Sequence, residues 1–230
     1  MPFLKFYQPS AIPFNNKHIM KAHTLETQST ISPEKALQFL KEGNQRFVNN
    51  LKMNRNLLEQ VNDTREDQFP FAVILSCIDS RTSAELIFDQ GLGDIFSVRI
   101  AGNFSNEDIL GSMEFACKVA GSKLVLVLGH TKCGALKGGL DAAAVNTLGL
   151  ANLSKLVLHF DPCIEEIMEE REERSSKNES LLNRLTVKNI LKTKEDIRQN
   201  SPILNKMEQD GEIIIAGANY DVETGEVRWI

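Results

Sequence analysis

The chain has 230 residues, of which 42% are hydrophobic and 25% are charged, and its formal net charge is −5. This length and composition suit a soluble protein with one globular domain and a sizeable core. The acidic balance argues against a general nucleic-acid-binding protein, and no apolar run approaches the ~20 residues of a membrane span.

The cysteines and the N-terminal segment predict a reducing compartment. Four cysteines in the whole chain are too sparse for a disulfide scaffold. The first thirty residues lack the unbroken apolar core of a secretory signal and the arginines of a transit peptide. We therefore expect a cytoplasmic protein with reduced thiols and no membrane association.

The N-terminal part of the chain divides into an extension and the start of a main domain. Residues 1–31 predict an irregular extension, either a floppy tail or an arm that packs on a partner subunit. The main domain, residues 32–230, opens with Ser32 as a helix N-cap, Pro33 at the first helical position and helical apolar spacing up to Leu51. Residues 52–70 are polar and predict a further helical piece or a loop.

Short apolar runs then alternate with helical patterns. The runs predict buried strands over 71–75, 95–100, 123–128 and 213–216, with an edge strand over 227–230. Helices are predicted over 83–88, 108–119, 134–144, 151–173 and 179–209. Strands that alternate with helices predict an α/β fold, with a central, mostly parallel sheet of four to five strands flanked by helices.

Two polar clusters each follow a predicted buried strand. Ser76-Cys77-Ile78-Asp79-Ser80-Arg81 comes after the first strand, and Gly129-His130-Thr131-Lys132-Cys133-Gly134 after the third. Ligands gather beyond the carboxyl ends of strands in open parallel sheets. Both clusters can therefore face one site, although 53 positions separate Cys77 from His130.

Together the clusters offer a zinc-type donor set. Cys77, His130 and Cys133 supply two sulfurs and one imidazole, which suits tetrahedral zinc and leaves a fourth position for Asp79 or for water. A lone cysteine after a strand is more often a small core residue, and redox chemistry is disfavoured because no Cys-x-x-Cys occurs. A phosphate loop fails because Ala135 and Leu136 stand where lysine and a hydroxyl residue are needed. The occurrence of both clusters at the ends of two adjacent predicted strands favours a metal site.

The two clusters resemble the signature segments of β-class carbonic anhydrases. Residues 68–102, 112–130 and 220–227 also resemble blocks of that family, so the resemblance covers about residues 32–230. It implies an enzyme with zinc on Cys77, His130 and Cys133. The implied reaction is the reversible hydration of carbon dioxide to bicarbonate and a proton, by attack of a zinc-bound hydroxide.

The resemblance also implies roles for an acid–guanidinium pair, or dyad. Asp79 would either ligate zinc in a closed state or pair with Arg81 in an active one. An arginine can hold a carboxylate bidentately, which leaves the metal free to take water. Asp79 could then accept a hydrogen bond from the bound hydroxide and orient it for attack.

By position in the resembling blocks, Gln68 would donate to a substrate oxygen, and Phe96, Ala101 and Phe115 would form apolar walls. In the family the residue matching Phe115 is often tyrosine and comes from the neighbouring subunit. The resemblance therefore implies a homodimer or a dimer of dimers with a shared site. The substrate partners are small molecules, carbon dioxide and bicarbonate.

One departure from the family and two other functions are also relevant. Some members hold an inhibitory bicarbonate beside a tryptophan three residues before the first zinc cysteine; Ile74 stands there, so we expect no such switch. Hydrolysis of carbonyl sulfide or carbon disulfide is an alternative activity on the same fold. A catalytically silent zinc scaffold is the binding-protein alternative, and the presence of Gln68, Asp79 and Arg81 argues against it.

Overall fold

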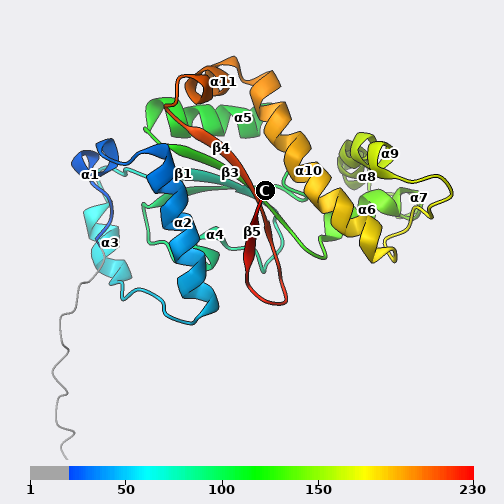
Figure 1. Ribbon diagram of the computed structural model, residues 1–230, viewed down its shortest axis with the longest axis horizontal. Coiled ribbons are helices and arrows are strands. Elements are labelled where there is room, and N and C mark those ends of the chain that lie inside the picture. The colour runs from blue at the N-terminus through cyan, green and yellow to red at the C-terminus, as the bar shows by residue number, and fades with distance from the viewer. Residues whose placement is uncertain (1–20) are drawn as a thin grey trace, which may run out of the picture.

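The computed structural model describes residues 21–230, whose centre is a five-stranded sheet of order β2-β1-β3-β4-β5 (Figure 1). The first four strands run parallel to their neighbours, and β5 pairs antiparallel with β4. The strands are β1 (Ala72–Ser76), β2 (Ile95–Arg99), β3 (Leu124–His130), β4 (Ile214–Tyr220) and β5 (Val227–Trp229). The predicted fold class and all five predicted strands are confirmed.

Helices cover both faces of this sheet. They are α1 (Leu25–Ser29), α2 (Pro33–Val48), α3 (Leu57–Asp63), α4 (Ala84–Ile87), α5 (Glu107–Glu114), α6 (Gly134–Leu140), α7 (Ala142–Asn146), α8 (Ala151–Val157), α9 (Asp161–Ile167), α10 (Glu179–Asn200) and α11 (Pro202–Gln209). A π-helical turn, η1 (Phe115–Val119), continues α5, and a 3₁₀ turn, η2 (Leu158–Phe160), joins α8 to α9. Within residues 21–230, no helix is both long and apolar enough to cross a membrane.

The core explains why the central strands are apolar throughout. Leu40 of α2 packs with Ile74 and Leu126 on one face of the sheet. Val73 and Val125 pack against α5, α10 and α11 on the other face. Every residue of β1 and β3 is therefore buried, as in parallel sheets covered on both sides. A third apolar cluster lies among α6, α9 and α10 and includes Cys77 and Cys133.

The predicted irregular extension is wrong over residues 25–29, which form α1. Thr24 caps this helix, and Gln28 inside it is only 4% exposed. The Gln28 side-chain amide donates to the carbonyl oxygens of Pro70 and Ala120, each at 2.8 Å. Side-chain hydrogen bonds to distant backbone hold α1 on its own domain, and no local periodicity reveals such bonds. Residues 1–20 of the predicted extension lie outside the described residues.

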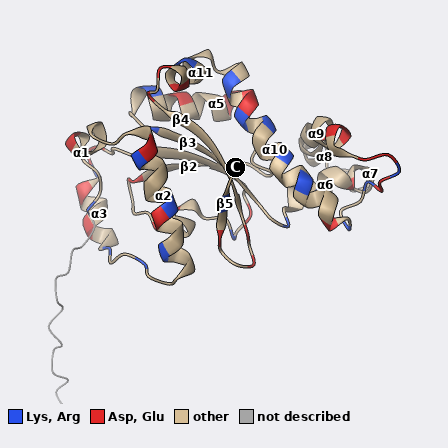
Figure 2. Ribbon diagram, viewed as in Figure 1, with Lys and Arg blue, Asp and Glu red and all other residues tan. Residues whose placement is uncertain are grey.

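The two long predicted helices are also interrupted. The helix predicted over 151–173 is broken at η2 and ends at Ile167, so residues 168–173 are not helical. Like charges at helical spacing in this acidic segment, red between α9 and α10 in Figure 2, disfavour a helix. Two of its carboxylates, Glu169 and Glu172, pair instead with Arg184 of α10. The helix predicted over 179–209 breaks at Ser201, because Pro202 starts a new helix.

A buried ion-pair cluster fixes the chain between α2 and β2. Asp89, with a side chain 3% exposed, accepts from Arg46 Nε at 2.6 Å, Arg55 Nη1 at 2.5 Å and the Met53 backbone at 3.1 Å. Burial raises the pKa of Asp89, but these hydrogen bonds outweigh burial and leave its pKa below the ordinary value. The carboxylate is therefore charged at neutral pH and balances two arginines.

We expect Asp89→Asn to lower the free energy of unfolding by about 3–5 kcal/mol at pH 7, because it leaves the Arg55 charge buried without a partner. The stabilisation from a depressed pKa is present above ~3.9 and is lost as the pH falls through the folded-state value. Urea unfolding of both proteins at pH 7 and near pH 3 measures this. A difference that stays constant across that range would contradict the prediction.

Candidate metal centre

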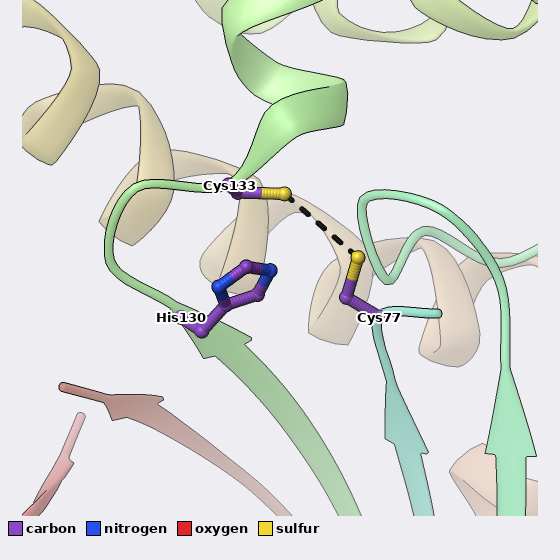
Figure 3. A group of neighbouring side chains, drawn as sticks. All are labelled: Cys77, His130 and Cys133. Atoms are coloured by element: carbon purple, nitrogen blue, oxygen red, sulfur yellow. Dashed lines mark hydrogen bonds between the residues drawn. The ribbon is translucent and has the colours of Figure 1, made fainter. Parts of the chain in front are cut away.

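Cys77, His130 and Cys133 meet beyond the carboxyl ends of two adjacent parallel strands. Cys77 directly follows β1, His130 ends β3, and Cys133 caps α6. The strands pair in register, with Ser76 opposite Leu128, so both ends reach the same edge of the sheet. In Figure 3 the three side chains point toward one another. The sequence prediction that these distant segments converge is confirmed.

The geometry of these three residues, the donor trio, fits a tetrahedral metal ion. Their ligand atoms all lie within 4.8 Å of one another, and the two Sγ atoms are 3.9 Å apart. Tetrahedral coordination with metal–sulfur bonds of ~2.3 Å requires a sulfur–sulfur distance of ~3.8 Å. The side chains are almost completely buried, at 3% exposure for Cys77 and 0% for the other two.

The imidazole of His130 has one nitrogen ready to bind a metal. Its Nδ1 lies 2.9 Å from the carbonyl oxygen of Thr131, which favours a proton on Nδ1. Its Nε2 is buried and has no hydrogen-bond partner among the described residues. A buried polar atom without a partner is costly. Metal binding would satisfy it, in the arrangement usual for ligating histidines, whose second nitrogen donates to an oxygen.

The two thiol groups are in hydrogen-bond contact, and either sulfur can be the donor. The hydrogen bond with Cys133 lowers the pKa of Cys77 to about 4, whereas the same contact, together with burial, raises the pKa of Cys133. The backbone amide of Gly102 also donates to Cys77 Sγ at 3.4 Å. Gly102 has φ +82°, and a Cβ there would lie 2.3 Å from the ring of Phe160, so the position requires glycine. The contacts around Cys77 therefore favour its thiolate, the form that binds a metal.

The loop between His130 and Cys133 turns sharply at Lys132. This residue has φ +57°, in the left-handed region, at a cost of roughly 1 kcal/mol for a residue other than glycine. Thr131 holds the loop in place, since its amide donates to the carbonyl oxygen of Tyr220 at 2.9 Å and its hydroxyl accepts from Val222 at 3.1 Å. The end of β4 therefore supports the turn that brings Cys133 back to His130.

Asp79 pairs with Arg81, one of the two arrangements expected from the sequence. Asp79 Oδ1 accepts from the Arg81 amide at 3.0 Å and from its Nε at 2.9 Å, and Oδ2 accepts from Nη2 at 2.8 Å. These bonds hold the pKa of Asp79 far below its usual range. The carboxylate is not part of the donor trio.

The four predicted substrate-binding residues do not gather at the trio within one chain. Ala101 lies beside it, next to Gly102. Phe96 contacts Phe115, with ring centroids 6.2 Å apart. In the sheet, Phe96 lies opposite Val73, which precedes Cys77 by four residues, or ~13 Å along the strand. Gln68 precedes β1, at its opposite end, and is exposed. A shared pocket would therefore need a second chain.

Sequence reasoning did not single out Gly102 or Thr131. A glycine directly beyond a strand end, beside a predicted site, was an available signal for Gly102. Thr131 carried no such signal, because its role depends on the backbone of Tyr220 and of Val222, the latter 91 residues away in the chain.

Comparisons with known proteins identify the family of this chain. A family model described as "Carbonic anhydrase" matches residues 72–227. Carbonic anhydrase 2 of Mycobacterium tuberculosis is 33% identical over 195 residues, which cover 84% of this chain and 91% of the relative. The carbonic anhydrase of Mycolicibacterium smegmatis is 44% identical over 112 residues, 48% of this chain and 54% of the relative.

Solved structures show the same fold. The β-carbonic anhydrase CcaA aligns with TM-score 0.65 and 25% identity over 84% of this chain and 91% of that one. The β-carbonic anhydrase CafA of Aspergillus fumigatus aligns with TM-score 0.63 and 27% identity over 75% and 81%. The mostly parallel sheet, the cysteine–histidine–cysteine site and these relatives together show that the chain belongs to the β-class carbonic anhydrases, enzymes that hydrate carbon dioxide.

Proposed function

We propose that this carbonic anhydrase holds zinc on Cys77, His130 and Cys133, and that the Asp79–Arg81 pair orients the attacking oxygen in the reversible conversion of carbon dioxide to bicarbonate and a proton. The observation that carries the proposal is the donor trio, two sulfurs 3.9 Å apart beside a buried imidazole nitrogen without a partner. Zinc there would lower the pKa of a bound water from ~15.7 toward ~7 and so supply hydroxide at neutral pH.

The protein's own contribution is orientation. Arg81 holds both oxygens of Asp79, so the carboxylate has one fixed direction and stays ionised. The remaining lone pairs of Asp79 can accept a hydrogen bond from a water or hydroxyl at the fourth metal position. When the proton of this hydroxyl is held in one direction, its lone pair faces the substrate carbon. This orientation lowers the activation barrier for attack on carbon dioxide.

We further propose that a second copy of the chain completes the substrate pocket, in a homodimer or a dimer of dimers. Phe115 is 53% exposed and Val119, one helical turn later, is 72% exposed. Large exposed apolar side chains that cluster on one face are typical of interaction sites. Gln68 and Phe96 would approach the trio of the partner, with Ala101 contributed by the trio's own chain.

The remaining expectations belong to the same proposal. Residues 32–230 would form the catalytic domain, with α1 of the preceding segment packed on it, and the enzyme would work in the cytoplasm. The four cysteines are free thiols, and two of them are in the donor trio, which suits a reducing compartment.

The decisive experiment is stopped-flow hydration of carbon dioxide on protein with a measured metal content. We expect about one zinc per chain and rapid hydration in the wild type. In the control Cys77→Ala, zinc and hydration should be lost together, because only two of the three donors remain. Hydration by metal-free protein, or stoichiometric zinc without hydration, would contradict the proposal.

A further inference from the structure

Arg99, the last residue of edge strand β2, reaches across to the loop that carries Cys77 and Asp79. Its Nε donates to the carbonyl oxygen of Cys77 at 2.9 Å. Its Nη2 donates to the carbonyl oxygen of Asp79 at 2.6 Å and to the hydroxyl of Thr82 at 3.3 Å. The register that pairs Arg99 with Ser76 places its side chain beside the start of this loop.

Thr82 binds the same carbonyl groups from inside the loop. Its hydroxyl, in a residue only 1% exposed, lies 3.0 Å from the Cys77 oxygen and 2.9 Å from the Asp79 oxygen. Its amide also donates to the Asp79 oxygen at 3.0 Å. The carbonyl groups on either side of Ile78 are thus each held by two side chains. Thr82 belongs to the same loop, whereas Arg99 comes from another strand.

The charge of Arg99 is not used in an ion pair. None of the salt bridges within residues 21–230 includes it, and its hydrogen bonds go to backbone carbonyls and a hydroxyl. Hydrogen bonds from a charged donor are stronger than those between neutral groups. The planar guanidinium can span two carbonyls at once, whereas a lysine ammonium is a single point.

We propose that Arg99 is a positioning residue for carbon dioxide hydration, acting through the backbone of Cys77 and Asp79. It fixes the carbonyl of Cys77, and thereby the direction of the first sulfur. It also fixes the carbonyl of Asp79, and thereby the side from which that carboxylate meets Arg81. This inference rests on the proposed function, because it concerns how the proposed metal ligand and dyad are held.

The test compares Arg99→Gln and Arg99→Lys with the control Arg228→Gln, which removes an exposed arginine from the other edge strand. We expect Arg99→Gln to keep zinc at the wild-type ratio but to lower kcat by ~10–100-fold with KM changed much less, because displacements of ~1 Å cost up to ~10²-fold. Arg99→Lys should recover part of the loss by binding one carbonyl. Arg228→Gln should match the wild type.

A second measurement does not depend on activity. Hydrogen exchange at the amides of Arg81 and Thr82 should be faster in Arg99→Gln and unchanged in Arg228→Gln, because these amides bond within the anchored loop. An unchanged kcat with unchanged exchange would overturn the proposal. So would the same loss of rate and the same faster exchange in the control Arg228→Gln. If the wild type lacks zinc or hydration, the proposed function fails, and faster exchange still supports the anchoring role.

Discussion

Replacing Cys133 by alanine is expected to abolish stoichiometric zinc binding and to lower carbon dioxide hydration by well over ~10²-fold. Mutating a group that merely supports a metal ligand already costs ~10–100-fold in affinity or activity, and here a proposed ligand itself is removed. Cys77 and His130 would remain as two donors, too few for a site that needs three protein ligands. Metal analysis per chain and stopped-flow hydration measure the two losses.

Cys117→Ala is the matched control. Cys117 is equally buried, at 2% exposure, but it lies in the apolar cluster under α5, away from the trio. Burial raises the pKa of its thiol to about 12, and Cys117 is not part of the metal-ligand group found among the described residues. This variant should keep zinc and a rate within ~2-fold of the wild type, at a modest cost in stability. Zinc retained in Cys133→Ala, or lost in Cys117→Ala, would contradict the assignment.

The meeting of Cys77 with His130 and Cys133 could be predicted from sequence for a physical reason. Continuous apolar runs identify strands buried on both faces, and such strands are parallel neighbours whose carboxyl ends share one edge. Polar residues directly after two of these runs must then lie near one another. The apolar runs do not predict the order of the strands in the sheet. No local feature of β2 or β4 indicates which strand it pairs with.

Other features depend on partners far along the chain or outside it. The loop anchors Arg99, Gly102 and Thr131 act through backbone groups of other elements, which no local pattern encodes. Phe96 and Phe115 have the spacing of core residues, yet Phe115 is exposed, since the face that would cover it belongs to a second copy in our proposal. Sequence periodicity reports burial without saying in which chain it occurs.

Asp79→Asn is expected to lower kcat by ~10²–10³-fold while zinc stays bound, within the range found for positioned proton-handling groups. In the wild type, two donors of Arg81 each bind one carboxylate oxygen of Asp79, at 2.8–2.9 Å. In the variant, an amide N–H group would face one of these donors and could not accept its hydrogen bond. The side chain would lose its fixed direction and its charge together. Arg81→Lys should cost less, because an ammonium still neutralises the carboxylate but binds it at one point.

The zinc dissociation rate separates the two roles that Asp79 could have. If Asp79 acts only by orienting the attacking oxygen, Asp79→Asn leaves the rate of zinc loss to a chelator unchanged. If it ligates zinc in the resting enzyme, the same substitution speeds that loss. Glu166→Gln is the control for a carboxylate changed to an amide, at an exposed ion pair with Lys188. Because Asp79 is held by three donors of Arg81 and is no part of the donor trio, the structure favours the first result.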